Sequence, residues 1–252
     1  EGRRKHRVGG IKDEDRKIVE LAVRDEESGE EYTISGDYIF STMPIRNLIQ
    51  ATNDVPMNVQ EVAEGLMYRD FMTVGLLMSE MKIKQPNGKL VPDNWIYIQE
   101  RDVKVGRLQV FNNWSPYLVA EDGKAWLGME YFVQEGDDLW TMADDDFIKF
   151  AVEELAKIDI IEAHNVEEAV VVRVPKAYPA YFGTYDRFHE IRKFTDNILN
   201  LFLIGRNGMH RYNNQDHSML AAMAAVDNII QGRFSKENVW TVNTETEYHE
   251  SK

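Results

Sequence analysis

The chain has 252 residues, a formal net charge of −14 at pH 7 and no cysteine. The lack of cysteine excludes disulfides, thiolate catalysis and cysteine-ligated metals, and the acidic balance argues against nonspecific nucleic-acid binding, which needs clustered cations. No apolar run approaches the length of a membrane span, and no signal-peptide pattern opens the chain. We therefore expect a folded cytoplasmic protein with one large core or two modest ones, and no nucleic-acid partner.

The first part of the chain reads as strands followed by helices. Strands are expected at 8–11, 18–23, 31–34 and 37–42, separated by charged or glycine-containing turns. We interpret these strands as a β-meander that ends at Met43-Pro44. Pro44 then opens a helix over 45–51, where its missing N–H costs nothing, and Asn58 is expected to cap a second helix over 58–66.

Strands dominate the middle of the chain. They are expected at 71–83, 95–98, 107–114, 125–133 and 169–174, which together predict an antiparallel sheet. The triplet Asp144-Asp145-Asp146 is expected to cap a helix that runs to about Ile158, because carboxylates suit the positive end of the helix dipole. We predict no metal site there, since adjacent side chains on a helix diverge.

An aromatic connection broken by prolines is expected from Lys176 to Gly183. It includes Tyr178 and Tyr181, which either line an apolar substrate pocket or pack in the ordinary way. A helix over 185–194 follows. Beyond Gly232, the mostly polar segment 233–252 is expected to be partly ordered at best.

The stretch between the helix over 185–194 and Gly232 is the most informative. It predicts a buried strand over 201–204, a polar loop over 205–214 and a helix that ends at Gly232. The apolar residues of this last helix that recur at helical spacing are Met219, Ala222, Met223, Val226, Ile229 and Ile230.

A strand that leads through a glycine loop to a helix N-terminus is suited to an anion, because exposed N–H groups and the helix dipole point to one place. Gly205 and Gly208 permit close backbone approach, and the guanidinium groups of Arg206 and Arg211 suit phosphate. From the pattern alone, a structural loop with solvated arginines is an equally good interpretation.

The loop sequence Gly205-Arg206-Asn207-Gly208-Met209-His210-Arg211-Tyr212, followed by Asp216, resembles the C-terminal flavin motif of UDP-galactopyranose mutases. More broadly, it is similar to the last FAD-binding segment of the amine oxidase and protoporphyrinogen oxidase superfamily. The turn Ser41-Thr42-Met43-Pro44 and the connection from Tyr178 to Gly183 resemble segments of the oxidase branch.

The resemblance implies an α+β fold, in which a mixed or antiparallel sheet domain that binds substrate accompanies the C-terminal remnant of a Rossmann-like FAD-binding domain. The implied domains are a meander at 1–43, the sheet domain at 44–182, the return to the FAD-binding domain at 183–232 and a polar tail at 233–252. The residues implied for FAD are Gly205, Arg206, Gly208, Asn214, Gln215, Asp216 and Met219. Those implied for substrate are Arg211, Tyr212 and Tyr181.

The sequence has no strand followed by Gly-x-Gly-x-x-Gly and a helix, the unit that binds the adenosine half of a dinucleotide. We therefore expect a C-terminal part of a longer protein, which binds FAD weakly if at all without an N-terminal FAD-binding half. Other catalytic patterns, such as Gly-x-Ser-x-Gly, His-Glu-x-x-His and a Walker loop, do not occur, and no catalytic residue is assigned.

Three functions remain open. In the first, the protein is an FAD-dependent oxidoreductase, whose flavin accepts hydride from a small organic substrate. In the second, it is a mutase that isomerises a nucleotide sugar on reduced flavin. In the third, it is a catalytically silent domain that binds a ligand or a partner.

Overall fold

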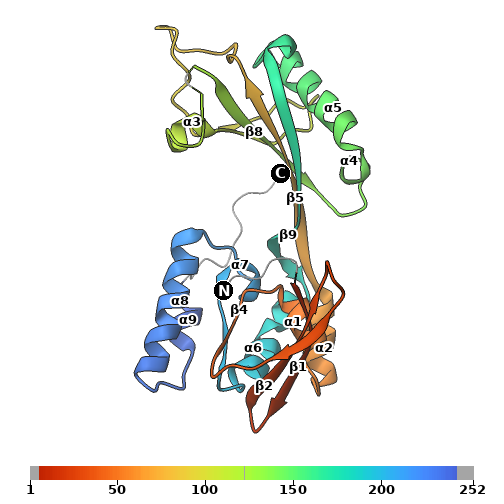
Figure 1. The fold of residues 1–252 in the computed structure, drawn as a ribbon, viewed down its shortest axis with the longest axis vertical. Helices are drawn as coiled ribbons and strands as arrows, with labels where there is room; N and C mark the ends of the chain where they lie inside the picture. The colour runs from red at the N-terminus through yellow and green to blue at the C-terminus, as the bar shows by residue number, and fades with distance from the viewer. Residues whose placement is uncertain (1–5, 122, 243–252) are drawn as a thin grey trace. The chain divides into compact units, whose positions relative to one another are not determined.

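The computed structural model describes residues 6–121 and 123–242, which divide into two compact units (Figure 1). The first unit combines Glu1–Tyr68 with Tyr178–Lys252, and the second unit is Arg69–Ala177. Two long strands, β5 (Leu66–Met78) and β9 (Val166–Gly183), carry the chain from one unit to the other. The α+β class predicted from the sequence is confirmed.

The strands of the first unit form two separate sheets. The antiparallel sheet has the order β1-β2-β3, and the parallel pair joins β4 to β10. Their bounds are β1 (His6–Glu14), β2 (Lys17–Asp25), β3 (Glu31–Ile34), β4 (Ile39–Ser41) and β10 (Leu201–Leu203). The prediction that β4 continues the meander is wrong, because its backbone groups pair with β10, in the register Ile39–Leu201 to Ser41–Leu203.

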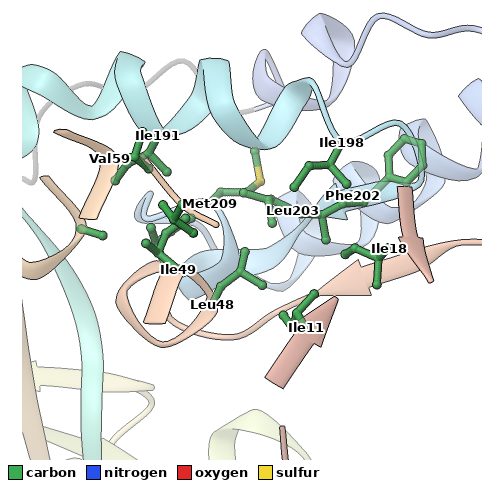
Figure 2. Packing of buried hydrophobic residues seen from close by; sticks show 14 of the residues in the cluster. Ile11, Ile18, Leu48, Ile49, Val59, Ile191, Ile198, Phe202, Leu203 and Met209 are labelled. Atoms are coloured by element: carbon green, nitrogen blue, oxygen red, sulfur yellow. The ribbon is translucent and has the colours of Figure 1, made fainter. Parts of the chain in front are cut away.

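The helices of the first unit are α1 (Ile45–Ala51), α2 (Met57–Gly65), α6 (Phe188–Asp196), α7 (Gly205–Gly208), α8 (Gln215–Ile230) and α9 (Glu237–Trp240), with a 3₁₀ turn η2 (Thr184–Arg187) before α6. Apolar side chains from both ends of the chain meet among them. Figure 2 shows Ile11 and Ile18 of the meander gathered with Leu48 of α1, Ile191 of α6 and Leu203 of β10. This core unites segments that are far apart in sequence.

Three expectations for the first unit require correction. Helix α2 begins after Pro56, and Asn58 does not cap it; the amide of Asn58 donates to Glu190 Oε2 at 2.6 Å instead. The loop over 205–214 contains a short helix, α7. The segment after Gly232, which was expected to be partly ordered at best, contains helix α9. This helix buries Trp240, whose Nε1 donates to Asp196 Oδ1 at 3.0 Å. Residues 243–252 lie outside the described part.

Most of the apolar residues that recur at helical spacing in α8 are exposed, although Ile229 is half-buried and packs against the core. The buried residues of α8 are Ala221, Ala225 and Asn228, and the larger apolar residues Met219, Leu220, Met223, Val226 and Ile230 are exposed. Small side chains allow a helix to approach its neighbours closely, so the alanine face lies on the unit. Asn228 is accepted in this face because its amide pairs with Asn238 and with the carbonyl of Ser235.

The second unit is a five-stranded sheet with the order β6-β7-β8-β5-β9 and helices against it. Its further elements are β6 (Trp95–Tyr97), β7 (Arg107–Val110), β8 (Ala125–Val133), α3 (Phe111–Trp114), α4 (Asp138–Thr141), α5 (Asp144–Lys157) and η1 (Ala163–Asn165). Phe147, Ala151 and Leu155 of α5 belong to the core that covers one face of the sheet. The three aspartates predicted to cap α5 form its first turn, after Ala143.

Two predictions for the second unit are wrong. Residues 111–114 form helix α3 rather than the end of a strand, because the amides of Asn112 and Asn113 bond the carbonyls of Lys124, Val91 and Asp93. Strand β9 also continues through Pro175 and Pro179 where a break was expected. This strand is at the edge of the sheet, where a missing N–H is tolerated.

The compact units do not follow the predicted domain limits at 43/44 and 182/183. Helices α1 and α2, which were expected to open the sheet domain, contribute Ile45, Leu48 and Val62 to the core of the first unit. The guanidinium of Arg46 bonds the carbonyls of Ala63, Glu64 and Leu66, which fixes the end of α2 against α1.

Asn200 offers a test of how the first unit is held together. Its Oδ1 accepts from the Ile18 N–H at 2.8 Å, and its Nδ2 donates to the carbonyls of Ile18 and Asp37. Asn200→Ala leaves these buried groups without partners, and we expect a loss of roughly 2–4 kcal/mol in the free energy of unfolding. The exposed Asn197→Ala is the control, with a loss of about 0.5 kcal/mol or less. Equal losses for the two variants in urea denaturation contradict this role.

Candidate functional site

The predicted anion site lies where β4 and β10 end. Since the two strands are parallel, their carboxyl ends lie side by side, and one continues into Thr42 and the other into Gly205. Gly205 has a φ of 75°, a conformation that favours glycine. A Cβ at Gly208 would overlap the Ser41 carbonyl oxygen, so this position requires glycine for close approach. Both predicted glycines therefore have a geometric role at the strand ends.

Helix α8 begins directly after this turn. Asn214 is its N-cap residue and has extended backbone, and the Asn214 N–H donates to His217 Nδ1 at 3.4 Å. The buried Asn213 accepts from Ser218 Oγ at 3.0 Å, which ties the loop to the first turn. Gln215 and Asp216 are exposed in that turn, as is Met219 one turn later. All four residues predicted for the flavin side of the site thus lie at the helix start, three of them exposed on α8 and Asn214 at its cap.

Arg206 is held in one orientation. Its Cζ lies over the rings of Tyr178 and Tyr212, 4.8 and 4.9 Å from their centroids, and its Nε donates to the Asn213 carbonyl at 3.0 Å. The two rings stack with their centroids 6.1 Å apart. Cation–π contacts and a backbone hydrogen bond therefore preorganise the guanidinium beside the start of α8.

The structure brings together only part of the predicted substrate set. The Tyr212 N–H donates to the Tyr181 hydroxyl at 2.6 Å, so Tyr181 and Tyr212 meet, with Arg206 over the ring of Tyr212. Arg211 has a different partner: its Nη1 donates to the Trp240 carbonyl at 2.8 Å. The two arginines are thus bonded to different segments, and Arg211 contributes to holding α9.

The loop contains a buried histidine, His210, which packs against the rest of the first unit. His210 is fully buried, with a φ of 45°, and its ring lies edge-on to Tyr68 at 4.8 Å. Its Nε2 lies 3.1 Å from the Ala180 carbonyl, which only accepts, so Nε2 carries the proton. Burial lowers the pKa of His210 from 6.5 to about 4 and raises the pKa of Tyr68 to about 12. Both groups are therefore neutral at pH 7.

Sequence reasoning missed several residues that shape this site. Tyr178 was considered only as a candidate pocket residue, although its ring lies under Arg206. The sequence does not show the roles of Asn213 and Ser41 at the site, because these roles come from their backbone carbonyls. The one signal that could have pointed to Tyr178 is chemical: an arginine in the loop, Arg206, tends to pack on an aromatic ring, and Tyr178 belongs to the aromatic connection before it.

Neither a metal cluster nor a membrane helix is found in the described ranges. Among residues 6–121 and 123–242, no group of three or more His, Asp or Glu side chains is arranged to hold a metal ion. In the same ranges, no helix combines the length and the apolar character that crossing a membrane requires.

Comparison with known proteins connects this geometry to a fold. The crystal structure of reduced UDP-galactopyranose mutase aligns with 94% of this chain at a TM-score of 0.71 and 22% sequence identity. The chain shares its fold with part of this mutase. A putative protoporphyrinogen oxidase from Exiguobacterium sp. 255-15 aligns with 80% of the chain at a TM-score of 0.54 and 15% identity. The resemblance predicted from the sequence is thus confirmed at the level of fold.

The likeness covers only part of these proteins. The chain spans 48% of the mutase and 42% of the oxidase, so it accounts for about half the length of either. No protein-family model matches the chain. No curated protein matches it either.

The buried His210 predicts a pH-dependent stability. Because its pKa in the folded protein is about 4, against the ordinary value of 6.5 in an unfolded chain, the unfolded state binds an extra proton between these values. The free energy of unfolding should therefore fall as the pH falls from 6.5 to 4, by on the order of 2–3 kcal/mol. In urea denaturation at a series of pH values, His210→Asn should remove this part of the dependence of the free energy of unfolding on pH. The exposed His189→Asn is the control, and an unchanged slope in His210→Asn refutes the assignment.

Proposed function

We propose that the first unit is the C-terminal part of an FAD-binding domain, and that it receives the cofactor's pyrophosphate at the carboxyl ends of β4 and β10. The observation that carries this proposal is the parallel pair, whose two ends meet a glycine turn and the start of α8. In open sheets with parallel strands, ligands bind outside the carboxyl ends, and helix N-termini there attract phosphate.

The residues present fit a pyrophosphate. Gly205 lacks a side chain that would keep a phosphate away from the backbone, and Gly208 lets the turn close on Ser41. The N–H groups at the start of α8 lie at the positive end of a helix of 16 residues. Arg206 adds a cation whose orientation is fixed by Tyr178 and Tyr212. In this arrangement Asn214, Gln215, Asp216 and Met219 are the residues nearest to the flavin side.

The adenosine half of the cofactor has no corresponding site in this sequence, which lacks the strand, Gly-x-Gly-x-x-Gly loop and helix. We infer that a further polypeptide segment supplies this unit, and that the pair β4–β10 is a remnant of the Rossmann-like sheet which that segment completes. The half-length match to the mutase and the oxidase supports this inference.

When bound, FAD supplies either hydride acceptance from an organic substrate or, in reduced form, nucleophilic catalysis at an anomeric carbon. The residues of this chain bind the cofactor and orient the substrate. The ring of Tyr212 lies against Arg206, and the Tyr181 hydroxyl accepts from the Tyr212 N–H, so these residues together suit a substrate that carries a diphosphate. Arg211 is the least suited of the predicted substrate residues, because it donates to the Trp240 carbonyl.

The mutase is the better supported of the two chemistries. Its fold covers 94% of this chain, against 80% for the oxidase, at a higher TM-score. The motif from Gly205 to Tyr212 also resembles that of the mutases. An oxidoreductase that takes hydride from a small organic donor is the second candidate, favoured by the turn at Ser41–Pro44.

Arg206 is the first residue to test. FAD is titrated onto the full-length protein, which includes the segment that supplies the adenosine site, while the quenching of flavin fluorescence is followed. Arg206→Ala removes a preorganised cation, so the dissociation constant should rise by roughly tenfold to a hundredfold, and Arg206→Lys should recover part of the loss. Arg24→Ala, which removes the same charge from an exposed position on β2, should change little. Equal effects of Arg206→Ala and Arg24→Ala remove the basis of the site.

The two chemistries differ in their need for a reductant. A mutase isomerises UDP-galactopyranose only after dithionite reduction and consumes no electrons over the cycle, which product analysis by chromatography would show. An oxidoreductase reduces its flavin with an organic donor and needs oxygen or a quinone for reoxidation, which absorbance would show. Turnover of the sugar nucleotide in fully oxidised enzyme fits neither expectation.

A further inference from the structure

Residues 235–240 form a short segment, here called the strap, which includes α9 and is fastened to two longer helices. At α8, the side chain of Asn228 pairs with that of Asn238 in both directions, at 2.8 and 2.9 Å. In the last turn of α6, the Thr195 carbonyl accepts from Nζ of the buried Lys236 at 3.4 Å. A cation suits this position, because the carbonyls at a helix C-terminus carry partial negative charge.

Trp240 ends the strap and is held by three contacts with α6. Its Nε1 donates to Asp196 Oδ1 at 3.0 Å, and its ring lies edge-on to that of Phe188, with the centroids 6.0 Å apart. Arg192 Cζ lies over the same ring, 5.2 Å from its centroid. These contacts fix the position of the buried tryptophan on α6, and with it the direction in which its backbone carbonyl points.

The strap meets the loop of the candidate site at this carbonyl. The Trp240 carbonyl accepts from Arg211 Nη1 at 2.8 Å, and the N–H of Arg211 donates to the Arg206 carbonyl at 3.0 Å. A second route runs through aromatic rings, because Phe188, which packs against Trp240, also stacks with His210 of the loop at 6.0 Å. One side-chain bond and one backbone bond thus join the strap to the residue proposed to hold the pyrophosphate.

The loop depends on such support from outside. Helix α7 within it has four residues, which is too short for a helix to be stable by itself. His210 has a φ of 45°, a conformation that costs free energy in a residue other than glycine unless its surroundings hold it. A loop that is already held in its binding conformation takes up a ligand without the entropic cost of ordering.

We infer that the strap fixes the conformation of the loop 205–214, and that Arg211 and Trp240 are positioning residues which keep Arg206 in place for a phosphate. The inference rests on the proposed function, because that function gives Arg206 its ligand. It assigns Arg211 a task within the protein, in place of the substrate contact expected from the sequence.

The first test titrates FAD onto the full-length protein. A helix that merely covered the core would need the buried indole of Trp240 but not the bond from Arg211, so Arg211→Met separates the two roles. The dissociation constant should rise by about threefold to tenfold, the range for the net loss of one hydrogen bond. The matched control is Arg16→Met, which removes the same charge and an exposed guanidinium bond to the Asn197 carbonyl, and it should change little.

A double-mutant cycle shows whether Arg211 acts through Arg206. If it does, Arg211→Met raises the dissociation constant by less than about twofold once Arg206→Ala is present, because the group that it positions is gone. Two effects that multiply overturn the inference. An effect of Arg206→Ala without any effect of Arg211→Met also overturns it and keeps the proposed function.

Amide hydrogen exchange of the full-length protein without FAD tests the strap independently of the cofactor. Arg211→Met, and Trp240→Phe, which removes the bond to Asp196, should each speed the exchange of residues 205–214 at least about threefold, while the amides of β2 keep their rates. Unchanged exchange of the loop in either variant overturns the inference. Faster exchange, combined with an FAD affinity that neither Arg206→Ala nor Arg211→Met changes, refutes the proposed function and keeps the strap as the support of the loop.

Discussion

The parallel alignment of β4 with β10 is the constraint on which the rest of the first unit depends. The two strands are far apart in the sequence, because the residues of the whole second unit separate them along the chain. The side chain of Asn200 joins them to the meander through the carbonyls of Ile18 and Asp37. Because this register places Ser41 beside Leu203, the chain turns at Gly205, Gly208 can close on Ser41, and α8 starts at the strand ends.

Local patterns in the sequence were sufficient for many elements. Helix α1 and strands β3 and β8 have the predicted bounds, because alternation of apolar residues, Pro44 and the turn glycines are local signals. The partner of β4 is not a local property. A short apolar strand after a meander is interpreted as its continuation, whereas the partner of its backbone groups is β10, which lies far along the chain.

The loop of the candidate site could be predicted from the sequence, but the residues that hold the loop in place could not. Glycine, arginine and a capping asparagine in sequence identify the turn. Two of the groups that orient Arg206, the ring of Tyr178 on β9 and the carbonyl of Asn213, are not indicated by that pattern. The buried face of α8 could not be identified from the sequence for a related reason. Helical spacing identifies two apolar stripes, one of alanines and one of larger residues, and spacing alone does not say which of them packs inward.

Strand β9 has one more consequence, which follows from its two prolines. Within a sheet, proline is accommodated where its nitrogen faces away from the neighbouring strand. At Pro175 and Pro179, a strand from another molecule would therefore find no amide hydrogen along this border. The opposite border, β6, offers only three residues. Growth of the five-stranded sheet from molecule to molecule, the first step towards fibrils, is thus hindered at both of its margins.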